Sequence, residues 1–246
     1  MKTVIVVQAR MGSTRLPGKH LKQVLGRPLL SYLVERLRRV KLANEIVLAT
    51  TTKPLDDQLV DFSRDEKLPF FRGSEEDVLD RYYQTAKKFQ ADTIVRISGD
   101  CPLIDPEVID NVINYFLQAQ PSLDYASNTL QRTFPRGMDT EVFSFESLEK
   151  VARDAQKPEE REHVTPFYYL HPDQFKIGSV QSEKDGSRFR WTVDTEEDFK
   201  LIKTILEEIY PKNPTFTLND LLELFKLHPE WMKINAHIQQ KSLKDS

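Results

Sequence analysis

The segment TVIVVQARMGSTRLPGK at residues 3–19 decides the fold of this chain. Its first part, residues 3–7, is an apolar and β-branched run that is typical of a buried strand. The run is short for the apolar part of a signal peptide and continues directly into the polar sequence QAR. The N-terminus therefore predicts the first strand of a sheet.

Three more runs repeat this pattern, at residues 45–50, 68–72 and 93–98, and the second of them is shorter. Helical periodicity separates the runs. Residues 28–40 carry one apolar stripe and open with Pro28, which suits the first turn of a helix. Alternating strand and helix patterns are the signature of a mostly parallel sheet with helices on both faces. The sequence thus predicts an α/β fold, with further helices at residues 56–66, 75–89 and 105–119.

After Pro121 the rhythm of the sequence changes. The last two helical patterns each follow a threonine that can cap them. We predict one domain over residues 1–246, in which residues 125–190 form an inserted region on the same sheet and residues 217–246 form a helical tail. The expected strands lie at 124–128, 139–145, 174–180 and 189–193, and the expected helices at 144–155, from 158 onward, 195–210 and 217–228.

The composition excludes several classes of protein. The chain has 246 residues, of which 39% are hydrophobic and 30% are charged, as in ordinary globular proteins. No apolar run approaches the roughly 20 residues needed to cross a bilayer. A formal net charge of −3 argues against a general nucleic-acid binder, and the single cysteine, Cys101, excludes an intramolecular disulfide and a cysteine-rich metal site. We therefore expect a cytoplasmic protein that binds neither a membrane nor a nucleic acid.

The loop at residues 8–19 has the composition of a phosphate cradle. Glycines let the backbone approach a ligand closely, short hydroxyls offer donors, and arginine and lysine supply positive charge. The loop matches neither the Walker pattern nor the G-x-G-x-x-G dinucleotide pattern. A solvated basic turn is the alternative, but such a turn does not require this combination directly after a buried strand. The residues concerned are Arg10, Gly12, Ser13, Thr14, Arg15, Gly18 and Lys19.

Two aspartates stand at the ends of predicted strands. Asp100 comes after the strand at 93–98, and Asp194 comes after the strand at 189–193. In open α/β sheets, ligands bind beyond the carboxyl ends of the strands. Mg²⁺ commonly takes one or two carboxylates together with substrate phosphates. The alternative for each aspartate is a helix or turn cap, which is the role we expect for Asp105.

The basic loop resembles a known family. Residues 9–19, ARMGSTRLPGK, resemble the opening signature of the cytidylyltransferases that activate acidic sugars, which include the 3-deoxy-manno-octulosonate and acylneuraminate enzymes. The resemblance is greatest to the branch of spore coat polysaccharide biosynthesis protein F. It spans nearly all of residues 3–210 and is strongest at the loop, at 99–106 and at 193–199, although Gln8 stands where many relatives have proline. It implies a Rossmann-like three-layer fold of the nucleotide-diphospho-sugar transferase (GT-A) type.

The resemblance also implies roles for individual residues. It makes Asp100 and Asp194 the ligands of Mg²⁺, and it places residues 72–82 near the nucleobase and ribose. Ser74 followed by Asp77 is also a helix-capping pattern, so a purely structural role for this segment remains the alternative. The candidate nucleotide-binding residues are Ala9, Arg10, Gly12, Ser13, Arg15, Lys19, Arg72, Ser74 and Asp77.

A second polar segment, residues 131–141, combines cations, a glycine and carboxylates. Its arginines can meet the carboxylate of an acidic sugar, and its carboxylates can hold sugar hydroxyls. By resemblance, residues 160–166 lie near the mouth of the same site, although a lone histidine on a helix is usually polar surface. The candidate acceptor-binding residues are Arg132, Arg136, Asp139, Glu141, Glu162 and His163.

The resemblance implies transfer of CMP from CTP to an acidic sugar, with release of pyrophosphate, and the cations and carboxylates above fit that reaction. Arg10 would hold the α and β oxygens, and Arg15 and Lys19 would neutralise the departing pyrophosphate. With Asp100, these three are the expected catalytic residues, and the sequence reveals no dedicated general base. By resemblance we also expect a homodimer that meets through residues 125–180, with the tail from residue 217 as the alternative.

Two other functions remain open from the sequence. One is an enzyme of the same fold with different chemistry, either a sugar-1-phosphate nucleotidyltransferase or a glycosyltransferase. A glycosyltransferase of this fold commonly carries Asp-x-Asp, whereas residues 100–102 read DCP. The other is a nucleotide-binding regulatory domain without turnover, against which the complete set of cations and aspartates argues.

Overall fold

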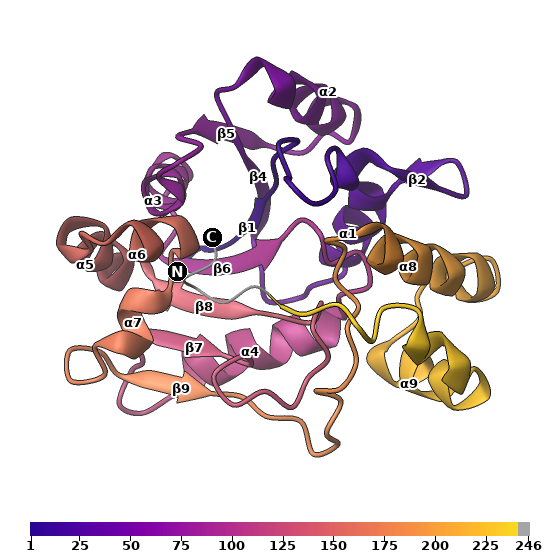
Figure 1. Cartoon of the computed structure of the whole chain (residues 1–246). Coiled ribbons are helices and arrows are strands. Elements are labelled where there is room, and N and C mark those ends of the chain that lie inside the picture. The colour runs from indigo at the N-terminus through magenta and orange to yellow at the C-terminus, as the bar shows by residue number, and fades with distance from the viewer. Residues whose placement is uncertain (241–246) are drawn as a thin grey trace.

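The computed structural model describes residues 1–240, and its centre is a seven-stranded sheet in the order β5-β4-β1-β6-β8-β7-β9 (Figure 1). All neighbouring strands run parallel except where β8 takes part, so the sheet is mostly parallel, as the sequence predicts. A separate antiparallel pair joins β2 (Gln23–Val24) and β3 (Arg27–Pro28). The sheet strands are β1 (Thr3–Gln8), β4 (Glu45–Thr51), β5 (Phe70–Gly73), β6 (Thr93–Ser98), β7 (Tyr125–Ser127), β8 (Glu141–Ser144) and β9 (Ile177–Ser179).

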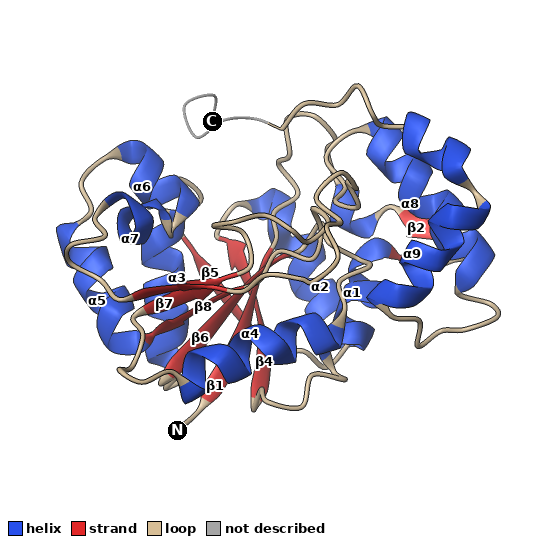
Figure 2. Ribbon diagram, turned by 90° about the horizontal axis from the view of Figure 1, so that it is seen from below, coloured by secondary structure: helices blue, strands red, loops and turns tan. Residues whose placement is uncertain are grey.

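Strand β1 shows why the sheet is covered on both faces. Its alternate side chains Ile5 and Val7 belong to one apolar cluster, and Val4 and Val6 belong to another, because successive side chains of a strand point to opposite faces. Helices α1, α2, α4, α8 and α9 contribute to the first cluster, and α3, α5 and α7 contribute to the second (Figure 2). The helices are α1 (Leu29–Leu37), α2 (Asp57–Asp65), α3 (Val78–Lys88), α4 (Pro106–Gln118), α5 (Phe145–Asp154), α6 (Pro158–His163), α7 (Pro166–Leu170), α8 (Glu196–Ile209) and α9 (Leu218–Leu227).

The predicted helices are present, and capping residues set where several of them begin. Asp105 accepts a hydrogen bond from the Glu107 amide at the start of α4, which confirms its expected role as a cap. Thr195 and Thr217 each form a capping box at the start of α8 and α9. Helix α3 starts at Val78 rather than at residue 75, because the Asp77 side chain accepts the Asp80 amide and closes the first turn there.

The run at 189–193 is not a strand, and in this respect the prediction is wrong. Its backbone makes one isolated bridge, between Arg136 and Arg190, and its Trp191 amide donates to the Arg136 carbonyl at 2.7 Å. Further along, the Val193 amide donates to the Asp100 carbonyl at 2.9 Å. The run therefore pairs with two loops rather than with a neighbouring strand, and this pairing brings Asp194 beside Asp100.

Residues 125–190 contribute β7, β8 and β9 to the same sheet as the first half of the chain. The tail packs on the core of its own chain through α9, where Leu221 and Phe225 are buried, and then forms the short helix η3 (Pro229–Lys233). The last six residues of the predicted tail, 241–246, lie outside the described part of the chain. Across residues 1–240, none of the helices combines the length and apolar character that a membrane crossing requires.

Candidate active site

A cavity of about 680 Å³ opens beyond the carboxyl ends of β1 and β6. It is lined by residues from the basic loop, from the end of β6 and from the inserted region, so it joins both halves of the chain. Most of the residues predicted for catalysis, acceptor binding and metal binding line this one cavity. They are Arg10, Arg15, Asp100, Arg132, Arg136, Asp139, Glu141, Glu162, His163 and Asp194.

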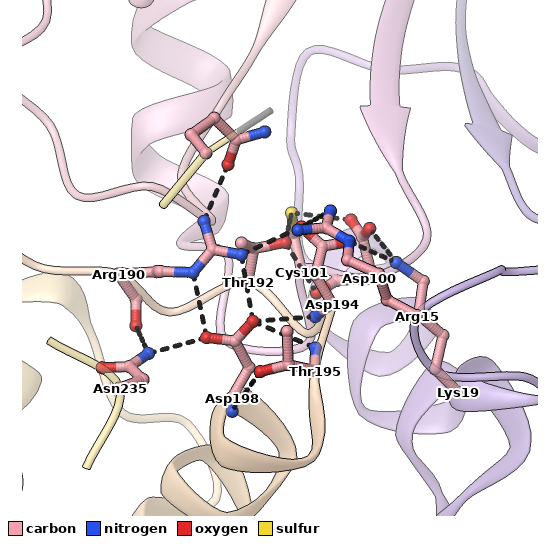
Figure 3. A network of polar contacts seen from close by, with 11 residues as sticks. Arg15, Lys19, Asp100, Cys101, Arg190, Thr192, Asp194, Thr195, Asp198 and Asn235 are labelled. Carbon is pink, nitrogen blue, oxygen red and sulfur yellow. Dashed lines mark hydrogen bonds and ion pairs between the residues drawn. The ribbon is translucent and has the colours of Figure 1, made fainter. Parts of the chain in front are cut away.

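Lys19 does not line the cavity itself, but its ammonium lies between the two aspartates that do (Figure 3). Its Nζ is 2.5 Å from Asp100 Oδ2 and 2.8 Å from Asp194 Oδ1. Burial alone would raise the pKa of the Asp100 carboxyl, but the charge and hydrogen bond of Lys19 hold that pKa well below its usual range. Burial acts against the charge of Lys19 as well, yet the two carboxylates raise its pKa. Lys19 and Asp100 therefore favour each other's charged form.

Two arginines reach the other oxygen of Asp194. Arg15 Nη2 and Arg190 Nη2 each lie 3.0 Å from Asp194 Oδ2. Two carboxylates thus face three cations in a partly buried site. Charge-assisted hydrogen bonds of this kind are stronger than neutral ones, and they fix the direction of both aspartate side chains.

The basic loop is closed by contacts that aim it at the cavity. Gly18 has φ of 69°, a left-handed conformation that favours glycine, and its amide donates to the Met11 carbonyl at 3.0 Å. The Met11 amide in turn donates to Asp56 Oδ1 at 2.7 Å. Asp56 is buried and was not predicted from the sequence. Ala9, Gly12 and Ser13 shape this loop but are not among the residues that line the cavity.

The residues predicted for the nucleobase make contacts within the fold. Arg72 donates to the carbonyls of Thr51 and Lys53 at 2.8 and 2.9 Å, and so ties β5 to the end of β4. The Ser74 hydroxyl accepts the Asp77 amide at 3.0 Å, and Asp77 caps α3. The capping alternative thus accounts for Ser74 and Asp77.

Neither Arg72 nor Ser74 lines the main cavity. Asp77 lines a neighbouring hollow of about 460 Å³ together with Arg10 and Glu162. There it forms an ion pair with Arg161 Nη2 at 2.6 Å. A nucleotide-binding role for the three predicted residues stays a prediction, and Asp77 has the position that suits it best.

Among the acceptor candidates, Arg132 and Arg136 differ in their partners. Arg132 binds both oxygens of Asp139, at 2.7 and 3.0 Å. Within residues 1–240, Arg136 forms no ion pair, and burial together with the nearby Arg132 charge lowers its pKa. Arg136 therefore presents to the cavity a guanidinium that forms no ion pair with a carboxylate of the described chain.

Glu141 is buried and already bound by several donors. The Tyr125 and Thr165 hydroxyls each donate to its Oε1 at 2.6 Å, and Arg96 pairs with its Oε2. Burial opposes the charge of Arg96, but Glu141 raises the pKa of that guanidinium above its usual value. Arg96 and Thr165 line the cavity and were missed from the sequence. A charged residue inside the buried run at 93–98 was the available signal for Arg96.

Residues 4–225 match the sequence model of the family described as cytidylyltransferase. The chain belongs to the cytidylyltransferase family. A cytidylyltransferase is a nucleotidyltransferase, so the chain belongs to a family of enzymes.

Known proteins resemble this cytidylyltransferase over most of its length. The structure of a cytidylyltransferase from Leptospira borgpetersenii serovar Hardjo-bovis is 36% identical, with a TM-score of 0.91 over 98% of this chain and 99% of that one. The spore coat polysaccharide biosynthesis protein SpsF of Bacillus subtilis is 32% identical over 92% of this chain and 95% of its own. CMP:2-keto-3-deoxy-manno-octonic acid synthetase, solved with CTP, shares the fold, with a TM-score of 0.65 at 19% identity over 85% of this chain and 99% of that one.

Proposed function

We propose that this cytidylyltransferase transfers CMP from CTP to an acidic sugar of the ulosonic or nonulosonic class, for the synthesis of a surface or spore polysaccharide. One observation supports this most directly. One cavity is lined by the two aspartates, by Arg136, and by Arg10 and Arg15, the cations that we expect to bind the triphosphate. The similarity to a spore coat polysaccharide protein supports the biosynthetic role.

The paired aspartates fit Mg²⁺. The Lys19 ammonium already shows that a cation can lie between their oxygens. Within residues 1–240, no cluster of three or more His, Cys, Asp or Glu side chains is placed to hold a metal, so two carboxylates are what the protein offers here. Mg²⁺ suits such a site because it takes one or two carboxylates and completes its shell with phosphate oxygens and water. When bound by Asp100 and Asp194, it would supply neutralisation of phosphate charge.

The side chains of the loop position the triphosphate. Arg10 and Arg15 offer guanidinium groups to its oxygens, and Lys19, once released from the aspartates, neutralises the pyrophosphate that departs. The oxygen of a sugar hydroxyl attacks the α-phosphorus, so a new O–P bond forms as the bond between the α-phosphorus and the oxygen that bridges it to the β-phosphate breaks. Pyrophosphate leaves with that oxygen, and the hydroxyl proton passes to solvent. Positioning and charge neutralisation are the main demands of such a transfer.

Arg136 is the best placed group for the carboxylate of the sugar. It faces the cavity, whereas the neighbouring Arg132 is already bound by Asp139. A guanidinium binds a carboxylate through two parallel hydrogen bonds, which also orients the sugar. Asp139 and Glu162, which line the same cavity, are candidates for its hydroxyls.

The test measures pyrophosphate release from each of the four nucleoside triphosphates with a panel of octulosonic and nonulosonic acids, in the presence of Mg²⁺. We expect release with CTP and at least one acidic sugar, and a CMP-sugar as the second product. Sugar 1-phosphates serve as control acceptors, because they lack the carboxylate of the acidic sugars. Turnover with a sugar 1-phosphate and none with any acidic sugar would overturn the proposal.

The predicted homodimer can be tested separately, by measuring the mass of the protein in solution. Light scattering after size exclusion should give about twice the chain mass of 28.7 kDa. A monomer at micromolar concentration would contradict the prediction without affecting the proposed chemistry.

A further inference from the structure

The guanidinium of Arg190 joins the site to the end of the described chain. Its Nη2 is 3.0 Å from Asp194 Oδ2, and its Nε and Nη2 bind the two oxygens of Asp198 at 2.9 and 3.0 Å. Its remaining nitrogen, Nη1, donates to Gln240 Oε1 at 2.7 Å. All three nitrogens of the guanidinium are thus engaged, and Gln240 holds the one that neither Asp194 nor Asp198 binds.

Asp198 anchors this network from the first turn of α8. Its side chain is fully buried and accepts the backbone amides of Asp194 and Thr195 at 3.0 and 3.2 Å. The amide group of Asn235 also donates to it, at 2.8 Å, and to the Arg190 carbonyl at 3.0 Å. A buried carboxylate needs several such donors, because an uncompensated charge is costly away from water. Asn235 is therefore part of what holds Arg190 against Asp198.

The segment that carries Asn235 and Gln240 also borders the catalytic cavity. Gln240 lines that cavity and a second one of about 320 Å³, whose lining includes Arg190. This segment follows the part of the chain that matches the family, which ends at residue 225.

We propose that residues 235–240 form a C-terminal strap that positions Asp194 through Arg190, with Asn235 and Gln240 as positioning residues. The proposal rests on the proposed role of Asp194 as a metal ligand. Asp194 shares its Oδ2 between Arg15 and Arg190, and its Oδ1 binds Lys19 (Figure 3). When Lys19 and Arg15 turn to the phosphates, Arg190 is the remaining cation that keeps the carboxylate aimed at the metal.

The test compares Gln240→Met with Gln239→Met in the full-length enzyme. Both substitutions replace an exposed glutamine by a side chain of similar length, but only the first removes an acceptor from Arg190. We expect Gln240→Met to raise the half-saturating Mg²⁺ concentration by roughly 3- to 10-fold, since outer-shell partners of metal ligands tune metal affinity. The KM for CTP at saturating Mg²⁺ and the melting temperature should change little, and Gln240→Glu, which keeps an acceptor, should restore the metal response.

A direct readout is the affinity for Mn²⁺ in the presence of CTP, measured by electron paramagnetic resonance. This measurement does not depend on turnover. Asn235→Ala should weaken Mn²⁺ binding as well. If Asn235→Ala folds poorly, Gln240→Met still tests the inference. Equal metal affinity in Gln240→Met and Gln239→Met would overturn the inference while leaving the proposed function intact. Unchanged Mn²⁺ binding and turnover in Asp194→Asn would instead overturn the metal role of Asp194.

Discussion

At the level of single residues, Lys19 lies in a position that could not be predicted from its place in the basic loop. The sequence predicts a lysine that meets the departing pyrophosphate, and the structure places its ammonium between Asp100 and Asp194. The lysine thus balances two partly buried carboxylates that would otherwise repel each other. A metal ion bound by these two aspartates would have to displace the Lys19 ammonium, because both cations would use the same carboxylate oxygens.

Asp100→Asn should lower turnover with CTP by at least about 100-fold, because it removes a charge from the pair that holds the cation. The fold should persist, since asparagine has the same shape and Lys19 keeps its bond to Asp194. Steady-state pyrophosphate release measures the effect, with the melting temperature as the control. Full turnover in this variant would contradict the assignment of Asp100.

Arg15→Ala should lower kcat by about 100- to 1000-fold, since the loss of one preorganised donor to developing charge has an effect of that size. Lys22→Ala is the matched control. It removes a cation from the same basic segment, but Lys22 pairs with Glu196 at 3.0 Å and does not line the cavity. Equal rates for the two variants would show that net charge, rather than the position of Arg15, supports catalysis.

At the scale of elements, the site depends on loops that hold one another. The turn at 136–137 pairs with residues 189–191, and the same run continues to Asp194. Gly137 has φ of 103°, and a Cβ built there would lie 2.6 Å from the Trp191 carbonyl oxygen. Only glycine therefore lets the two loops approach closely enough to form this pairing.

Gly137→Ala should lower the free energy of unfolding by about 2 to 4 kcal/mol, through backbone strain and the clash with Trp191. Gly26→Ala is the control, because Gly26 also has a positive φ, of 74°, but a Cβ at that position would meet no atom within 4 Å. It should cost only about 1 to 2 kcal/mol. Urea unfolding compares the two, and similar losses would mean that the close approach at Gly137 is not what matters.

At the level of the whole molecule, the buried His20 makes the stability of the fold depend on pH. His20 is buried beneath the cavity, and burial together with the charge of Lys19 lowers its pKa to about 4. The folded chain therefore keeps this imidazole neutral between about pH 4 and its ordinary pKa near 6.5, whereas the unfolded chain binds a proton there. Stability is fully present above that range and is lost as the pH falls through it.

The free energy of unfolding should fall by about 2 kcal/mol between about pH 7.5 and about pH 5 on account of His20 alone. The variant His20→Gln, which cannot titrate, should show a loss smaller by that amount. Urea unfolding of both proteins at the two pH values measures the difference. Parallel pH profiles would show that His20 does not contribute.

The order of strands and helices was predictable because its signals are local. Buried runs such as 93–98 and caps such as Asp105 and Thr195 act within a few residues, so the sequence shows them directly. The run at 189–193 was misassigned for the opposite reason. Its residues have strand-like side chains, but its hydrogen-bond partners lie in distant loops that no local pattern reveals.

By itself, the sequence determined the α/β alternation, the basic, glycine-containing first loop and the two aspartates at the ends of buried runs, because each depends on residue types close together in the chain. Only the tertiary structure decided that Lys19 lies between those aspartates and that Arg190 holds one of them with the help of Asn235 and Gln240. These contacts join segments that are far apart in sequence. They exist because buried charges must find partners wherever the folded chain places them.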